Sequence, residues 1–271
     1  MTPDSGGSPE ATRDLGSWRN PPLAYVVAEL RISPYYTVKE LMPALQSALR
    51  ESFPRTIEGS ELVIDTSSPP VQQPVWQLAS ADNARAVYLS TRSLALHATA
   101  YINFADFLKR WSHVLRAAHS SGLNAFVERA GLRYLDLIVP TADSRPEDYL
   151  VEQLRGVHAS ESAKIQSSAW GVALSVERFV LQANIAAPSP EGMLFAPNFY
   201  ALQLIKPRVM LEAEQRMKEK LPIGYIDTDG WCPLQEVLQP EPILELYGQL
   251  HDKVSSLFVS VLSDRAKEEW K

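Results

Sequence analysis

The chain has little of several features that mark common protein classes. It carries a single cysteine, Cys232, among 271 residues, so an intrachain disulfide and a zinc site of two or four cysteines are both excluded. One cysteine is typical of a reducing compartment, and we expect a cytoplasmic protein. Residues 1–19 are rich in Gly, Ser and Pro and lack the basic and apolar segments of a signal peptide. We therefore predict a disordered leader there.

Motifs for membranes, nucleic acids and phosphate chemistry are also missing. No stretch approaches the roughly 18 apolar residues of a membrane span. The net charge of −6 argues against a nucleic-acid partner, since such proteins present a basic surface. The sequence has no G-x-S-x-G elbow, no Walker A loop and no G-x-G-x-x-G motif. We therefore predict no cofactor and favour a protein that is not an enzyme.

What is present indicates an ordinary globular core. Hydrophobic residues make up 45% of the chain and charged residues 21%, which is close to the average for folded domains. Runs of β-branched and aromatic residues predict strands, and apolar residues spaced by three and four predict helices. The predicted strands are 23–32, 61–65, 75–80, 86–91, 94–102, 130–139, 169–176, 179–186, 200–209 and 223–227. The predicted helices are 38–52, 103–120, 145–154 and 242–271, and 212–220 is either a helical insert or a long loop.

Short links between neighbouring strands predict hairpins, and hairpins give antiparallel pairing. The fold class is therefore α+β, with antiparallel sheets covered by long helices. The order strand, helix, strands, helix occurs twice along the chain. This repetition suggests two fused similar halves, 20–125 and 126–271, although any α+β chain can be divided in a similar way.

Three polar residues in the predicted strands are candidates for a pocket. His97 and Tyr101 alternate with apolar residues in the strand 94–102 and would share its less apolar face. Arg133 interrupts a very apolar strand, where a charge needs a partner. These residues would line a pocket, or His97 would be a half-exposed sheet residue and Arg133 would form a structural ion pair with Glu29.

Two acidic residues form the best local candidate for a metal site. Asp227 and Asp229 stand two residues apart after a predicted strand, and carboxylate oxygens bind divalent cations. The segment lacks the rest of a calcium-loop pattern. The alternative is a strand that ends in an Asp-Gly turn at Asp229-Gly230.

Aromatic residues suggest a contact surface. Tyr35 and Tyr36 follow the first predicted strand, and Trp270 stands in a charged C-terminal segment, where we expect it to be exposed or to dock on a partner. The partner would be another protein or a second copy of this chain.

Several segments together resemble a sporadically distributed family of uncharacterised bacterial proteins of about this size. They are 21–32, 76–80, 94–101, 104–111, 131–138 and 250–264. The resemblance implies membership without an activity, and patchy distribution is associated with accessory genes such as toxin–antitoxin and phage-defence genes.

Two hypotheses for function follow from the sequence. The first is a non-enzymatic protein-binding module of a bacterial accessory system, acting as an antitoxin, immunity, defence or chaperone-like component. The alternative is an α+β protein that binds or converts a small molecule in a pocket between sheet and helices. The alternative predicts a contiguous cavity with convergent polar groups.

Overall fold

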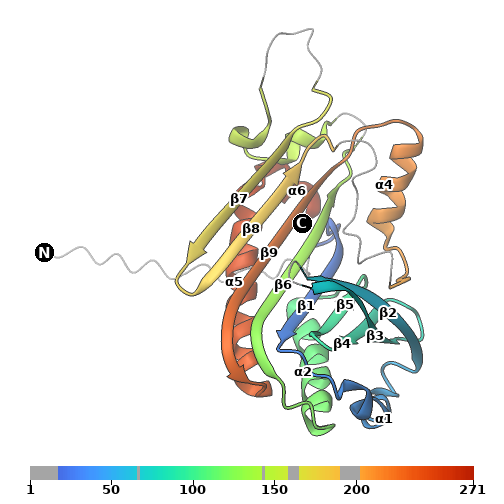
Figure 1. Ribbon diagram of the computed structural model, residues 1–271. Coiled ribbons are helices and arrows are strands. Elements are labelled where there is room, and N and C mark those ends of the chain that lie inside the picture. The colour runs from blue at the N-terminus through green and yellow to red at the C-terminus, as the bar shows by residue number, and fades with distance from the viewer. Residues whose placement is uncertain (1–17, 66–67, 142–143, 158–164, 190–201) are drawn as a thin grey trace, which may run out of the picture.

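The computed structural model describes residues 18–65, 68–141, 144–157, 165–189 and 202–271. A nine-stranded sheet in the order β2-β3-β4-β5-β1-β6-β9-β8-β7 forms its centre, and every neighbouring pair is antiparallel (Figure 1). The predicted α+β class is confirmed. The strands are β1 (Leu23–Ile32), β2 (Arg55–Asp65), β3 (Ser68–Ala79), β4 (Arg85–Ser90), β5 (Ser93–Ala98), β6 (Phe126–Ile138), β7 (Ala169–Val176), β8 (Phe179–Ala186) and β9 (Gly224–Val237).

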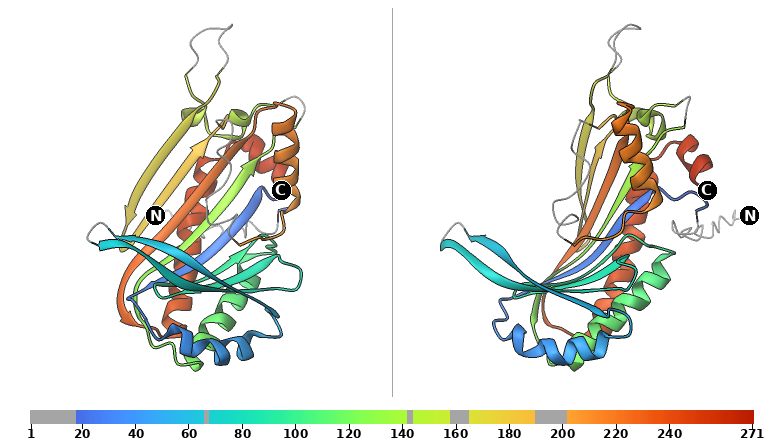
Figure 2. Two further views of the ribbon diagram at one scale, coloured as in Figure 1. Left: turned by 45° about the vertical axis from the view of Figure 1, so that its right-hand side comes forward. Right: turned by 90° about the vertical axis from the view of Figure 1, so that its right-hand side faces the viewer.

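The helices divide the sheet into two unlike faces. Helices α2 and α5 pack on one face, here called the helix face, while α4 lies against the opposite, open face near β1 and β6 (Figure 2). The strongly bent sheet also carries the β2–β3 ribbon away from the helices. The helices are α1 (Val38–Leu49), α2 (Phe104–Ser120), α4 (Arg208–Lys218), α5 (Pro240–Val261) and α6 (Asp264–Trp270), with short 3-10 turns η2 (Pro146–Tyr149) and η3 (Glu152–Leu154). In the described part of the chain, no helix is long and apolar enough to cross a membrane.

The alternation of residues along each strand explains the two faces. On β1, Val26, Ala28 and Leu30 are fully buried beneath the helices, and their neighbours in sequence point to the open face. Trp111 of α2 and Tyr247 of α5 meet edge to face over this core, 5.7 Å apart between ring centroids. The main core is therefore continuous across β1 and β6.

The sheet order places corresponding strands symmetrically about its centre. β1 and β6 are neighbours, and outward from them lie β5 and β9, then β4 and β8, then β3 and β7. Two halves related by a two-fold axis between β1 and β6 would have this order. One sheet and one main core join the two parts. Their common origin remains a prediction.

Three predicted elements differ from the structure, and the first is the helix predicted for 145–154, which consists of the two short 3-10 turns η2 and η3. The strand predicted for 200–209 is wrong in its described part: residues 202–207 are not a strand, and α4 begins at Arg208 after Pro207. The alternating residues Leu202 and Leu204 instead pack on the open face without a strand partner. The single C-terminal helix is two helices, because the Ser263 hydroxyl accepts from Ala266 N and caps α6. Of the predicted leader, residues 1–17 lie outside the described residues.

Strands β3 and β9 are longer than predicted. β3 runs through Pro69, Pro70 and Pro74, and its ladder to β4 covers only Val75–Ala79. Its first residues therefore have one neighbouring strand, an arrangement that tolerates proline. β9 continues through Gly230, where a turn was predicted.

Gly230 passes directly beneath α5, and we predict that Gly230→Ala destabilises the fold. An added β-carbon would lie 2.4 Å from Val254 Cγ2 and 3.1 Å from Leu181 Cδ2. Overpacking of this kind costs about 1–3 kcal/mol, and urea denaturation should show the loss. Gly248→Ala in α5 is the matched control, because its β-carbon meets nothing within 4 Å and alanine favours a helix. Equal stabilities of the two variants would contradict the predicted clash.

Candidate functional site

The open face carries a trough of about 370 Å³ across the middle of the sheet. Its floor lies close to the backbone because the strands present small side chains there, namely Ser93 and Ala95 of β5, Val27 of β1 and Gly131 of β6. Larger polar side chains surround this floor. They are Tyr25, Glu29, Arg31, Glu61, Tyr88, His97, Arg129, Arg133 and Asp229, and Leu202 completes the lining.

One side of the trough is a wall of arginines from β6 and carboxylates from β9. Arg133 makes a two-pronged contact with Asp227, with N–O distances of 2.7 and 2.6 Å, and this hydrogen bonding raises the pKa of Arg133. Arg129 lies 3.5 Å from Asp229 and 4.5 Å above the ring of Trp231. Burial raises the pKa of Asp229 even though Arg129 and Arg133 oppose that shift. Arg133 therefore holds Asp227 with two of its five N–H donors, whereas Arg129 has a looser partner.

Tyrosines and a histidine form the other side. Tyr88 of β4 donates to Glu61 of β2 at 2.6 Å, which ties the curved ribbon to the trough. Tyr25 is hydrogen-bonded to His97 Nδ1, and the two rings stack at 5.9 Å. Burial lowers the pKa of His97 to about 3 and raises that of Tyr25, so the pair is uncharged at neutral pH.

Two polar atoms of the trough residues lack partners. Arg129 Nε and His97 Nε2 are buried and have no hydrogen bond to any described residue. A buried nitrogen without a partner costs stability, so most such groups in proteins are bonded to protein, water or ligand. These two nitrogens mark the polar ends of the trough.

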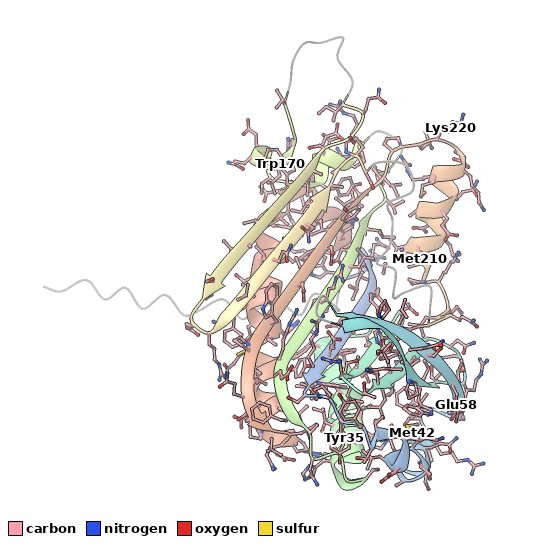
Figure 3. The ribbon with its side chains drawn as sticks, viewed as in Figure 1. Tyr35, Met42, Glu58, Trp170, Met210 and Lys220 are labelled. Carbon is pink, nitrogen blue, oxygen red and sulfur yellow. The ribbon has the colours of Figure 1, made fainter. Side chains whose placement is uncertain are left out.

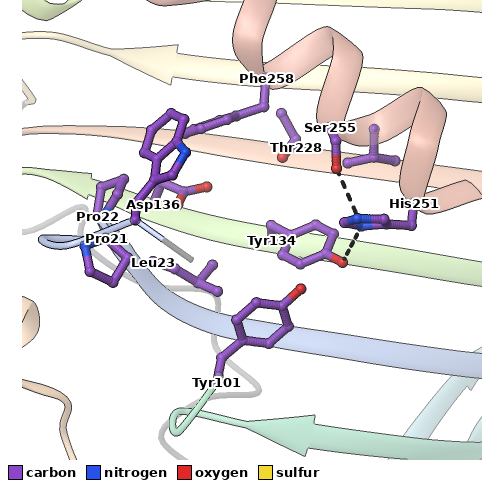
Figure 4. Close-up of a pocket in the computed structure, with 12 residues that line it drawn as sticks. Pro21, Pro22, Leu23, Tyr101, Tyr134, Asp136, Thr228, His251, Ser255 and Phe258 are labelled. Atoms are coloured by element: carbon purple, nitrogen blue, oxygen red, sulfur yellow. Dashed lines mark hydrogen bonds between the residues drawn. The ribbon is translucent and has the colours of Figure 1, made fainter. Parts of the chain in front are cut away.

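The three predicted pocket residues belong to two different cavities. His97 and Arg133 line the trough together. Tyr101 does not, because β5 ends at Ala98 and the alternation that would put Tyr101 beside His97 stops there. Tyr101 instead lines a small cavity on the helix face with Tyr134 and His251 (Figure 4).

Asp227 and Asp229 lie in the middle of β9 and not in a turn after it. Asp227 is paired with Arg133 and Asp229 with Arg129, so an arginine already supplies the positive charge that a metal ion would bring to each carboxylate. Within the described ranges, no three His, Cys, Asp or Glu side chains are grouped in a way that could hold a metal ion.

The predicted contact residues are separated in the structure. Tyr36 is 76% exposed. Its neighbour Tyr35, which is labelled in Figure 3, is half-buried and donates to Gly122 O at 3.2 Å. Trp270 is only 5% exposed, so the expected exposure is wrong. It packs against Trp18 and Tyr149, with ring centroids at 6.3 and 5.4 Å. A charged local sequence could not reveal this burial, because both partners are far away along the chain.

Sequence reasoning missed Tyr25, Tyr88 and Arg129, which line the trough. The signal for Tyr25 is present in the sequence, because strict alternation along β1 puts it on the same face as Glu29 and Arg31. No family model matches the chain, and no curated protein matches it either. The functional argument therefore depends on the geometry of the site.

The neutral state of His97 predicts a pH dependence of stability. The unfolded chain takes up a proton near pH 6.5, whereas the folded chain does so only near pH 3, so the free energy of unfolding falls as the pH drops between these values. This histidine accounts for up to about 1.4 kcal/mol per pH unit. When the free energy of unfolding is measured in urea from pH 6.5 to 4.5, the His97→Gln variant should lack this contribution to its dependence on pH. His113→Asn, at an exposed position, should keep it; a wild-type slope in His97→Gln would refute this assignment.

Proposed function

We propose that the protein binds a small organic anion, a carboxylate or phosphate compound, in the open-face trough. The observation that carries this proposal is the convergence of Arg31, Arg129 and Arg133 on a cavity of about 370 Å³ with a small-residue floor. Ligand pockets typically measure about 300–1,000 Å³ and contain a few placed polar groups. The alternative hypothesis from the sequence required a cavity with convergent polar groups but placed it between the sheet and the helices, whereas the trough lies on the open face.

Arg129 is the best anchor for the anionic group. Its one carboxylate contact is long, at 3.5 Å, and its Nε has no partner among the described residues. Gly131 has no side chain, so the backbone beside Arg129 is open to a ligand. Guanidinium groups bind carboxylate and phosphate in a two-pronged fashion.

The acidic residues of the trough indicate which polar groups the ligand would have away from its anionic end. Glu29 and Glu61 face the trough from β1 and β2, and carboxylates accept hydrogen bonds. A ligand with hydroxyl or amino groups opposite its anionic end would bind the arginines with that end and donate hydrogen bonds to the two glutamates. Glu61 already accepts from Tyr88, and Glu29 Oε2 lies 3.7 Å from Arg31 Nε, so each carboxylate has one partner within the chain and further oxygen lone pairs for a ligand.

The site favours binding over catalysis. Ser93 is the one hydroxyl on the floor, and its Oγ lies 3.2 Å from that of Ser90, with no histidine in contact. Cys232 lies on the helix face, buried in the main core, and burial raises its pKa. A covalent nucleophile needs an adjacent base, and none of the described groups supplies one here.

Arg129→Met should weaken anion binding while the fold survives. We expect at least a tenfold loss of affinity, because a charge-assisted contact in a partly buried site is removed. Thermal shifts with inorganic phosphate and with a panel of phosphate and carboxylate metabolites would find the ligand, and calorimetry would measure the loss. Arg116→Met is the control, since Arg116 lies on α2 and pairs with Glu241 on the other side of the sheet. An equal loss in both variants, or no anion bound by the wild type, would reject the proposal.

A second feature supports the protein-binding hypothesis. Strand β7 ends the described sheet, and its sequence AWGVALSV has no charge and no proline. Trp170, Val172 and Leu174 are each about 40% exposed, at 40%, 39% and 40%. Natural edge strands usually carry charges or prolines that block pairing. We propose that β7 pairs with a strand of another chain in the bacterial cytoplasm, and a second copy is the simplest partner, because antiparallel pairing of one strand with itself is two-fold symmetric.

This edge can be tested by the oligomeric state. We expect the wild type to form dimers in sedimentation velocity experiments and Leu174→Lys to shift them toward monomers, since lysine protects an edge. Leu211→Lys makes the same change at a 53% exposed position on α4 and should leave the dimer intact. A monomeric wild type at high concentration would exclude self-pairing.

A further inference from the structure

The helix face contains a small cavity whose chemistry is opposite to that of the trough. It measures about 20 Å³ and lies between the first described residues, β6, β9 and α5. Figure 4 shows Asp136, Thr228 and Tyr134 around the same space. The lining is otherwise aromatic and apolar, with Trp18, Pro21, Pro22, Leu23, Tyr101, His251, Val254, Ser255 and Phe258 completing it.

Asp136 is buried here without a counter-ion. Its side chain comes from the middle strand β6, the residue is 5% exposed, and no described side chain forms a hydrogen bond or ion pair with it. Burial, with Asp227 as a lesser cause, raises its pKa well above the usual range. An isolated carboxylate in such surroundings is costly and stays protonated unless a positive charge joins it.

The cavity also offers a second unused polar group. Thr228 is fully buried, and its Oγ1 has no hydrogen-bond partner among the described residues. Thr228 pairs with Tyr134 across the β6–β9 ladder, and Asp136 is two residues further along the same face. One carboxyl group and one hydroxyl group thus face a space of about 20 Å³, which holds a water molecule or a similarly small group.

The remaining polar groups around the cavity leave Asp136 without a neighbouring cation. His251 Nδ1 lies 3.0 Å from Tyr134 Oη and 3.2 Å from Ser255 Oγ, and its ring stacks on Phe104 at 3.9 Å. Tyr101 contributes its ring at the half-buried edge of the cavity, and Asp227 lies across the sheet on the open face. The Trp18–Leu23 segment contributes only aromatic and apolar side chains to the lining.

We propose that this cavity binds the protonated amino group of a small amine, with Asp136 as its counter-ion and Thr228 as a hydrogen-bond acceptor. Aromatic rings attract ammonium groups through their negative faces, and Trp18, Tyr101, Tyr134 and Phe258 supply such rings. A calcium or magnesium ion would need about six oxygen ligands, far more than these two side chains offer. On binding, Asp136 releases its proton to solvent and the ammonium ion takes its place, so charge balances.

Methylammonium chloride, titrated against potassium chloride at constant ionic strength, tests the proposal by amide NMR. We expect saturable shifts near Thr228 with a dissociation constant on the order of 10 mM, as a two-heavy-atom ligand allows. The affinity should rise from pH 6 to pH 8, because protons compete for Asp136 at lower pH. Calorimetry in buffers of different ionisation enthalpy should show the released proton.

Matched variants make the outcome decisive. Asp136→Asn replaces a neutral acid by a neutral amide and should weaken binding at least tenfold, whereas Asp252→Asn, one residue beyond His251 on the exposed side of α5, should not. Thr228→Val tests the same site independently and should weaken binding several-fold. The proposal fails if the shifts do not saturate, which is the result expected when the cavity holds only a water molecule. It also fails if potassium produces the same shifts, or if Asp136→Asn and Thr228→Val bind methylammonium as the wild type does. Arg129→Met should have no effect, which separates this cavity from the trough.

Discussion

Strand β6 has to satisfy two environments at once, and the rest of the molecule is arranged around that requirement. It lies between β1 and β9 near the centre of the sheet, so residues 129–136 are fixed by strand pairing on both sides. Ala130 and Leu132 point into the core beneath α5, while Arg129 and Arg133 point to the open face. The backbone of both arginines is paired with β1 and with β9, so the two side chains are held on the open face. Asp227 and Asp229 on β9 therefore act as their nearest counter-charges.

This arrangement also explains why the open face holds a polar trough and not a second apolar core. Helix α4 and Leu202 cover only one part of that face, near Tyr25, Leu135 and Leu137. Where the cover ends, the floor consists of small side chains, so water or a ligand can reach the backbone level. The ion pairs are only partly buried, with side-chain exposures of 37% for Arg133 and 11% for Asp227. We expect such pairs to orient the site more than they stabilise the fold.

The sequence predicted the class of fold well because antiparallel strands with one buried face have a visible period of two. The limits of the elements were harder to predict. Gly230 has the local sequence of a turn, yet it lies inside β9. A glycine stands there because α5 leaves no room for a side chain above it. Pairing between distant strands was not visible either: His97 and Arg133 meet through β1, which lies between them. Tyr101 was assigned to the wrong side because the strand stops three residues before it.

The first and last described segments are joined to each other. Arg19 N donates to Lys271 O at 3.1 Å and Asn20 N to Trp270 O at 3.0 Å, while Trp18 packs against Trp270 and Phe258. These two segments therefore support one wall of the helix-face cavity together, so a change in one is felt by the other. An affinity tag placed directly after Lys271 would begin at the carbonyl that accepts from Arg19 N and would therefore disturb this contact. Linking residue 271 to residue 18 by a short loop would instead preserve the contact, and new ends could then be opened in an exposed turn elsewhere.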